Sequence, residues 1–211
     1  YYFELKKEKF MRHIKHCFDV LPNINKLINL NKSNENINKN NHQIKPIFII
    51  GVPRSGSTLV EKVIASGVKR IPIGEETGII NKFIIKKIQE KQLLNLNKES
   101  CKMELFNEYK YKGLIAEKTD YAFTDKSLEN FFFIELIKEI FPNAKVINCK
   151  RNALSSIMSI FQTNLVFEAW THNLEHIFKY FDNYYRIIEN FKNNFPNFIY
   201  EVEYEKFVND P

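Results

Sequence analysis

At residues 46–59 the chain reads Pro46-Ile47-Phe48-Ile49-Ile50-Gly51-Val52-Pro53-Arg54-Ser55-Gly56-Ser57-Thr58-Leu59. An apolar run typical of a buried strand breaks here into a turn of small residues, and a helical pattern follows. Gly51 and Gly56 permit backbone angles that are closed to other residues. The free N–H groups of a helix that starts near Ser57 attract an anion. This order of strand, turn and helix predicts a cradle for a phosphate-like group.

Side chains of the same turn add to the cradle. Ser55, Ser57 and Thr58 supply hydroxyls, and Arg54 supplies a planar group of permanent positive charge. The spacing of the two glycines also matches the nucleotide triphosphatase loop, G-x-x-x-x-G-K-[ST]. Ser57 stands where that loop needs its lysine, and we find no apolar strand ending in an aspartate that would hold magnesium. A P-loop kinase or nucleotide hydrolase with an altered loop is therefore kept as the alternative enzyme.

Two segments outside the loop complete a family pattern. Residues 141–152 contain a strand that ends at Arg151, and Ser159 follows eight residues later. Residues 74–77 read Gly74-Glu75-Glu76-Thr77. Together with residues 53–59, these segments resemble the sulfotransferases that use 3′-phosphoadenosine 5′-phosphosulfate (PAPS). The turn at 74–77 is similar to that of the tyrosylprotein sulfotransferases and their bacterial relatives. The resemblance covers residues 45–211.

The resemblance implies a role for each matching residue. Glu75 corresponds to the catalytic base, and Lys126, in the turn Phe123-Thr124-Asp125-Lys126, corresponds to the lysine at the oxygen between phosphate and sulfate. Arg54 would counter the charge of the transferred group. No metal is implied. The residues implied in nucleotide binding are Arg54, Ser55, Gly56, Ser57, Thr58, Leu59, Arg151, Ser159 and Tyr204.

The rest of the chain alternates between strand and helix patterns. We expect strands at 46–50, 144–149 and 198–202, and helices at 58–66, 79–88, 99–111, 127–141, 152–161 and 170–195. Such alternation implies parallel strands. The sequence therefore predicts an α/β fold with a P-loop-like central parallel sheet flanked by helices.

The N-terminal part differs in character from the rest. Residues 1–20 interleave lysines with apolar side chains and predict a basic amphipathic helix, and residues 23–41 read as an Asn-rich linker. We therefore divide the chain into residues 1–44 and a sulfotransferase domain at 45–211. In this family a further C-terminal segment closes over the nucleotide, so we expect the domain to be truncated at its C-terminus.

Composition narrows the function classes. The chain has 211 residues, of which 44% are hydrophobic, so it can build a core. Its net charge is +6, but the lysines are scattered among acids, which argues against nucleic-acid binding. No stretch approaches the roughly 20 apolar residues of a membrane span. Three separated cysteines without a Cys-x-x-Cys pair argue against a metal site and favour a reducing, cytoplasmic location.

These features predict a sulfotransferase that moves the sulfuryl group of PAPS to an acceptor hydroxyl by in-line displacement, without a metal. The acceptor is open among peptide tyrosine, carbohydrate and small molecules, because fold likeness does not fix a substrate. A homodimer is also left open. The non-enzymatic alternative is a nucleotide-binding module that docks a partner and does not catalyse.

Overall fold

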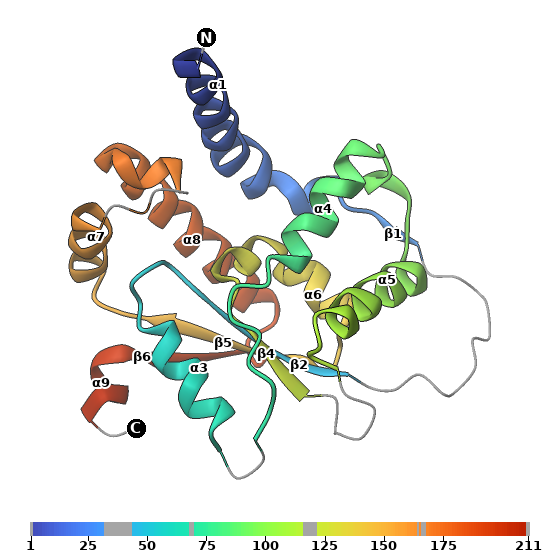
Figure 1. The fold of residues 1–211 in the computed structure, drawn as a ribbon. Helices are drawn as coiled ribbons and strands as arrows, with labels where there is room; N and C mark the ends of the chain where they lie inside the picture. The colour runs from blue at the N-terminus through green and yellow to red at the C-terminus, as the bar shows by residue number, and fades with distance from the viewer. Residues whose placement is uncertain are drawn as a thin grey trace.

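The computed structural model of the chain describes residues 2–31, 44–67, 70–115, 122–163, 165 and 168–209. Within these residues, the larger sheet has four parallel strands in the order β4 (Ala122–Asp125), β2 (Lys45–Gly51), β5 (Lys145–Lys150) and β6 (Ile199–Glu203). Helices lie on both of its faces (Figure 1). The predicted α/β fold with a P-loop-like central parallel sheet flanked by helices is confirmed.

The pleat of β2 sends its side chains into two separate cores. Phe48 and Ile50 belong to the large core on one face, whereas Ile49 belongs to a small cluster on the other face with Cys149 of β5. Phe48, Ile49 and Ile50 are all fully buried. A central strand that is covered on both faces needs apolar residues at consecutive positions, which explains the continuous apolar run in the sequence.

The helices divide between the two faces of the sheet (Figure 1). One face carries α3 (Ser57–Ala65) and α9 (Tyr204–Asn209). The other face carries α4 (Ile79–Gln89), α5 (Lys98–Tyr111), α6 (Ile134–Ile140) and α8 (Leu174–Asn194). Helix α7 (Ala153–Gln162) follows β5 directly. The three-layer arrangement leaves the carboxyl edge of the sheet accessible for a ligand.

Helix α8 is the longest of the described helices and anchors the large core. Asn173 caps its first turn, because its side-chain oxygen accepts a hydrogen bond from the His176 amide at 3.1 Å. The Tyr184 hydroxyl donates to Asn148 of β5 at 2.7 Å and so ties the helix to the sheet. The buried stripe has helical spacing and consists of Ile177, Tyr180, Phe181, Tyr184, Ile188 and Phe191.

Residues 23–31 are more ordered than the sequence suggests. Helix α1 (Tyr2–Lys15) leads through short turns, His16–Val20 and Leu21–Asn23, into α2 (Ile24–Leu27), and β1 (Leu30–Asn31) pairs in parallel with β3 (Leu96–Asn97). The predicted linker at 23–41 is wrong for residues 23–31, because Ile24 is fully buried in the large core and Leu30 pairs with Leu96. Residues 32–43 of that linker lie outside the described part of the chain.

Most predicted boundaries agree with the structure within one residue at each end. Strand β4 was not predicted. The helix expected at 127–141 is divided into the 3-10 helix η4 (Leu128–Phe133) and α6, and the helix expected at 170–195 begins as the 3-10 helix η5 (Ala169–His172) before α8. Another 3-10 helix, Leu93–Asn95, precedes β3. Among the helices of the described ranges, none is long and apolar enough to cross a bilayer.

Candidate functional site

The candidate site lies at the carboxyl edge of the sheet. Because all four strands are parallel, their ends meet at one edge, and a predicted site residue follows each strand: the 52–56 loop after β2, Lys126 after β4, Arg151 after β5 and Tyr204 after β6. Open parallel sheets bind ligands at this edge. The topology thus gathers residues that lie far apart in the sequence.

The loop at 52–56 has the geometry of an anion cradle. Gly56 is the N-cap of α3 in a left-handed conformation, and the amide N–H groups of Gly56, Ser57 and Thr58 donate to no carbonyl of the described residues. The hydroxyl of Ser55 is buried and without a partner in the same part of the chain. Free N–H groups and an orphaned hydroxyl suit phosphate or sulfate oxygens. The Leu59 amide, also expected here, donates to Gly56 O at 3.0 Å.

Arginine side chains surround this cradle. Arg54 Nε donates to Ser159 Oγ of α7 at 2.9 Å, and Arg151 Nη1 donates to the backbone oxygen of Arg54 at 3.0 Å. The Arg151 guanidinium also lies 4.8 Å from the ring centre of Tyr204. That ring covers Gly56 so closely that a Cβ built there would lie 2.2 Å from it. Arg54, Gly56, Arg151, Ser159 and Tyr204 therefore form one contacting group.

The charge of this group is largely uncompensated. Within the described residues, neither Arg54 nor Arg151 forms an ion pair with a carboxylate. The exposed carboxylate of Glu205 interacts with Arg151 only weakly. Its pKa is lowered mainly by the backbone N–H of Asn152, which donates to it at 3.1 Å, and to a lesser extent by the charge of Arg151. Two guanidinium groups beside free amides attract a ligand with more than one negative charge.

Glu75 lies on a turn that runs beside the end of β4. The Thr124 amide donates to Pro72 O at 3.0 Å, and the Lys126 amide donates to Glu75 O at 2.8 Å. Glu75 itself has a left-handed backbone with φ of 54°, and its side chain is exposed. Gly74 is required next to it, because a Cβ would lie 2.0 Å from Thr124 O.

Lys126 is buried, with an exposed fraction of 5%. Its Nζ lies 2.8 Å from a carboxylate oxygen of Glu76, whose side chain is 70% exposed. The structure therefore brings Lys126 to the turn of Glu75 and pairs it with Glu76. Glu75, Glu76 and Lys126 thus form a second group, and no described contact joins it directly to Arg54 or Arg151.

Sequence reasoning missed the residue that connects the two groups. Glu61 of α3 is 1% exposed, and its Oε1 accepts hydrogen bonds from the Glu75 amide at 3.1 Å and the Thr124 hydroxyl at 2.7 Å. Helix α3 begins at the anion cradle, so Glu61 fixes the Glu75 turn relative to that cradle. Glu61 shares the buried face of α3 with Ser57, Val60 and Ala65, and its position directly after Val60 was the available signal.

Asp125 bears on the expectation that no strand ends in an aspartate that would hold magnesium. A strand that ends in an aspartate does lie beside β2, namely β4 with Asp125. Its oxygens accept four hydrogen bonds at 2.7–2.9 Å, from Thr77, from Tyr109 and from the amide and hydroxyl of Ser127. Such a saturated carboxylate holds the fold together. Across the described ranges, no group of three or more His, Cys, Asp or Glu side chains is placed to hold a metal ion.

The fold and the turn after β2 define the class of the chain, an α/β protein in which a P-loop-like turn joins β2 to α3. Comparison with known proteins gives the family: a family model described as "Sulfotransferase family" matches residues 46–211. The chain belongs to the sulfotransferase family. It is also similar to an uncharacterized protein of Aquifex aeolicus (strain VF5), with 29% identity over 181 residues. That similarity covers 79% of this chain but only 24% of the length of the relative.

Proposed function

We propose that the protein transfers the sulfuryl group of PAPS to a hydroxyl of an acceptor molecule. The observation that carries the proposal is the contacting group of Arg54, Gly56, Arg151, Ser159 and Tyr204 around free helix N–H groups. PAPS carries negative charge at both its 5′-phosphosulfate and its 3′-phosphate. The two arginines of the site offer a cation for each.

The residues of the chain fit the two ends of this nucleotide. The amides of Gly56, Ser57 and Thr58, the Ser55 hydroxyl and Arg54 would hold the 5′-phosphosulfate. Arg151, Ser159 and Tyr204 would hold the 3′-phosphoadenosine part. PAPS supplies an activated sulfuryl group, and the nucleotide phosphate takes the bonding electron pair as the sulfur–oxygen bond breaks. The buried ammonium of Lys126 is suited to stabilise that leaving oxygen.

Glu75 supports the other half of the chemistry. The acceptor oxygen forms the new bond to sulfur and must lose its proton, and an exposed carboxylate on a rigid turn can accept it. The saturation of Asp125 argues against the alternative P-loop kinase or hydrolase, because an aspartate at that strand end would be needed for magnesium. The three cysteines, all free and buried, agree with the cytoplasmic location that we keep as part of the proposal.

Calorimetric binding of 3′-phosphoadenosine 5′-phosphate, compared with ATP and magnesium, tests the nucleotide site. We expect the former to bind and Arg151→Ala to weaken it by at least about tenfold, because a charged hydrogen bond is lost. Lys150→Ala, at the adjacent strand position, is the matched control. Preference for ATP with magnesium would overturn the proposal in favour of the kinase or hydrolase.

Glu75→Ala tests catalysis separately from binding. Loss of a general base should lower turnover by about 10²–10⁴-fold while nucleotide affinity is kept. Glu189→Ala, an exposed position on α8, is the control for a lost carboxylate. If nucleotide binds but no acceptor is sulfated by the wild type, the non-catalytic module is the better description.

A further inference from the structure

A cavity of about 320 Å³ opens beside the candidate site. Its wall begins at Pro53, next to Arg54 of the anion cradle, and includes Glu76 of the Glu75 turn. The remaining wall comes from α4, η4, η5 with the residues before it, and α8, and it includes Glu129, Asn130, Glu168 and Trp170. We call this cavity the Glu129 pocket. Its size suits one ring or one side chain of a larger molecule.

The charge of the Glu129 pocket is opposite to that of the whole chain. The chain carries a net charge of +6, yet the described residues that line the pocket include three carboxylates, Glu76, Glu129 and Glu168, and no lysine, arginine or histidine. Lys126, which is not among the lining residues, forms an ion pair with Glu76 at 2.8 Å, and His13 Nε2 lies 3.8 Å from Glu168. Carboxylates concentrated in a concave site favour a cationic ligand.

Glu129 is the carboxylate with the least compensation. Asn81 Nδ2 donates to it at 2.8 Å, but no cation of the described residues forms an ion pair with it. Burial, and then the charges of Glu168 and Glu76, raise its pKa to about 7. A half-buried carboxylate that lies near other negative charges is stabilised when a cation binds beside it.

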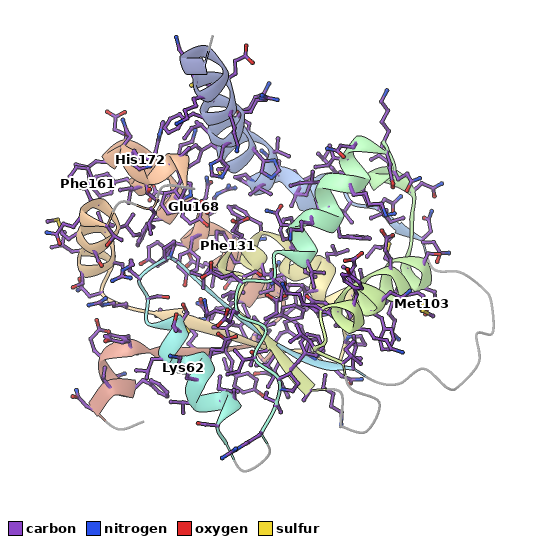
Figure 2. The ribbon with its side chains drawn as sticks, viewed as in Figure 1. Lys62, Met103, Phe131, Phe161, Glu168 and His172 are labelled. Carbon is purple, nitrogen blue, oxygen red and sulfur yellow. The ribbon has the colours of Figure 1, made fainter. Side chains whose placement is uncertain are left out.

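Two further groups point to a ligand in the Glu129 pocket. Asn130 is fully buried on the pocket wall, and neither its amide nitrogen nor its amide oxygen has a partner within the described residues. An amide with a free donor and a free acceptor can satisfy a hydroxyl. Glu168 is held in place, since the Trp170 indole donates to it at 3.0 Å. Figure 2 places Glu168 nearer the centre of the molecule than Phe161 and His172.

We propose that the Glu129 pocket selects an acceptor that carries a protonated amine as well as its hydroxyl groups, with the amine between Glu129 and Glu168. This inference rests on the proposed sulfotransferase function and specifies its acceptor. Pro53 and Glu76 both line the pocket, so an acceptor bound there would lie next to the cradle and the Glu75 turn. Acidic acceptors are rejected, because they would add a further negative charge beside the three carboxylates of the pocket.

Trp170 provides the readout, because it is the sole tryptophan of the sequence and lines the pocket. The probes are glucosamine and N-acetylglucosamine, which differ in the charge of one nitrogen. We expect glucosamine to change the Trp170 fluorescence saturably and to bind at least about tenfold more tightly than N-acetylglucosamine, with 3′-phosphoadenosine 5′-phosphate present or absent. Sulfation with PAPS should show the same preference.

Glu129→Gln tests the carboxylate itself. This substitution should lower the affinity for glucosamine at least about tenfold and abolish the preference for glucosamine over N-acetylglucosamine. Nucleotide affinity should stay unchanged. Glu135→Gln, an exposed position of α6, is the matched control. Equal binding of both sugars, tighter binding of N-acetylglucosamine, or an unchanged preference in Glu129→Gln would overturn the inference. If glucosamine binds selectively but the nucleotide does not bind, the proposed function fails while the amine selectivity stands.

Discussion

Arg54 and Glu75 share an uncommon backbone conformation. Both have positive φ, 68° and 54°, which costs a residue other than glycine about 1–3 kcal/mol. In each case another predicted site residue donates to the carbonyl oxygen of the strained residue: Arg151 to Arg54 at 3.0 Å, and the amide of Lys126 to Glu75 at 2.8 Å. Hydrogen bonds between site residues thus stabilise the strained backbone of Arg54 and Glu75.

Gly74→Ala should disturb the Glu75 turn without touching the cradle. The added methyl group would overlap Thr124 O, so the turn must shift, and we expect turnover to fall by about 10²-fold. Nucleotide affinity, measured by calorimetry, should remain. Gly67→Ala is the control, since its Cβ would meet only Ile64 O at 3.3 Å. Full turnover in Gly74→Ala would show that the position of Glu75 is not critical.

Glu129 should make stability depend on pH. Its pKa is raised from 4.5 to about 7, so between these values the native state keeps a proton that the unfolded state has released. The free energy of unfolding should therefore fall by about 3 kcal/mol at most as pH rises from 4.5 to above 7, and then level off. Urea unfolding across this range should show the fall in wild type and its absence in Glu129→Gln. A parallel pH profile in the two proteins would contradict the raised pKa of Glu129.

The individual site residues were predictable to an uneven degree. Arg54, Arg151 and Tyr204 each follow a strand that the sequence predicts, so parallel pairing alone brings them together. The pairing of Lys126 with Glu76 was not predictable, since adjacent glutamates on a turn give no sign of which one a distant lysine will contact. Such pairs depend on the tertiary path of the chain.

Among the elements, α3 links binding to catalysis. Its first turn supplies the free amides, and Glu61, further along its buried face, holds the Glu75 amide and the Thr124 hydroxyl. Any displacement of this helix would move both groups together.

Glu61 should act as a positioning residue. In Glu61→Ala two buried donors lose their acceptor, at a cost of about 1–3 kcal/mol each, and turnover should fall with nucleotide affinity retained. Glu61→Gln keeps a carbonyl oxygen at the same place and should restore most of the turnover. Steady-state kinetics on both variants, with calorimetry, make the comparison. Equal losses of turnover in Ala and Gln would assign Glu61 a different role.

Strand β4 shows why some elements escape sequence reasoning. It has four residues, and two of them, Thr124 and Asp125, are polar but fully buried. Their burial depends on partners such as Glu61, Thr77 and Tyr109, which come from other elements. A pattern of apolar periodicity cannot detect a strand whose polar side chains are satisfied by tertiary contacts.

At the scale of the whole molecule, the N-terminal residues belong to the same core as the sheet. Cys17, Phe18, Leu21 and Ile24 pack in the large core, where Phe131 also lies near the centre of the molecule (Figure 2). The family match begins only at residue 46. The sequence patterns predicted three of the four strands of the central sheet. The burial of the N-terminal segment depends on contacts with α8, η4 and η5 that no local pattern encodes.

Ile24→Ala should therefore destabilise the whole protein. Loss of a fully buried isoleucine costs about 2–5 kcal/mol, which urea unfolding would register. Met11→Ala, at a position that is 58% exposed on α1, should change the free energy of unfolding by less than about 0.5 kcal/mol. If the two variants were equally stable, the N-terminal segment would not be part of the cooperative core.

The three buried cysteines can report how often different parts of the protein unfold locally. Cys17 lies before α2, Cys101 on α5 and Cys149 on β5, and burial raises the pKa of Cys101 to about 11 and of Cys149 to about 12. The thiolate is the nucleophile that attacks an alkylating reagent, so each buried cysteine reacts only when its own surroundings open to water and reagent. Three labelling rates, resolved by peptide mass, would therefore rank how often the N-terminal segment, the α5 layer and the central sheet expose themselves to water.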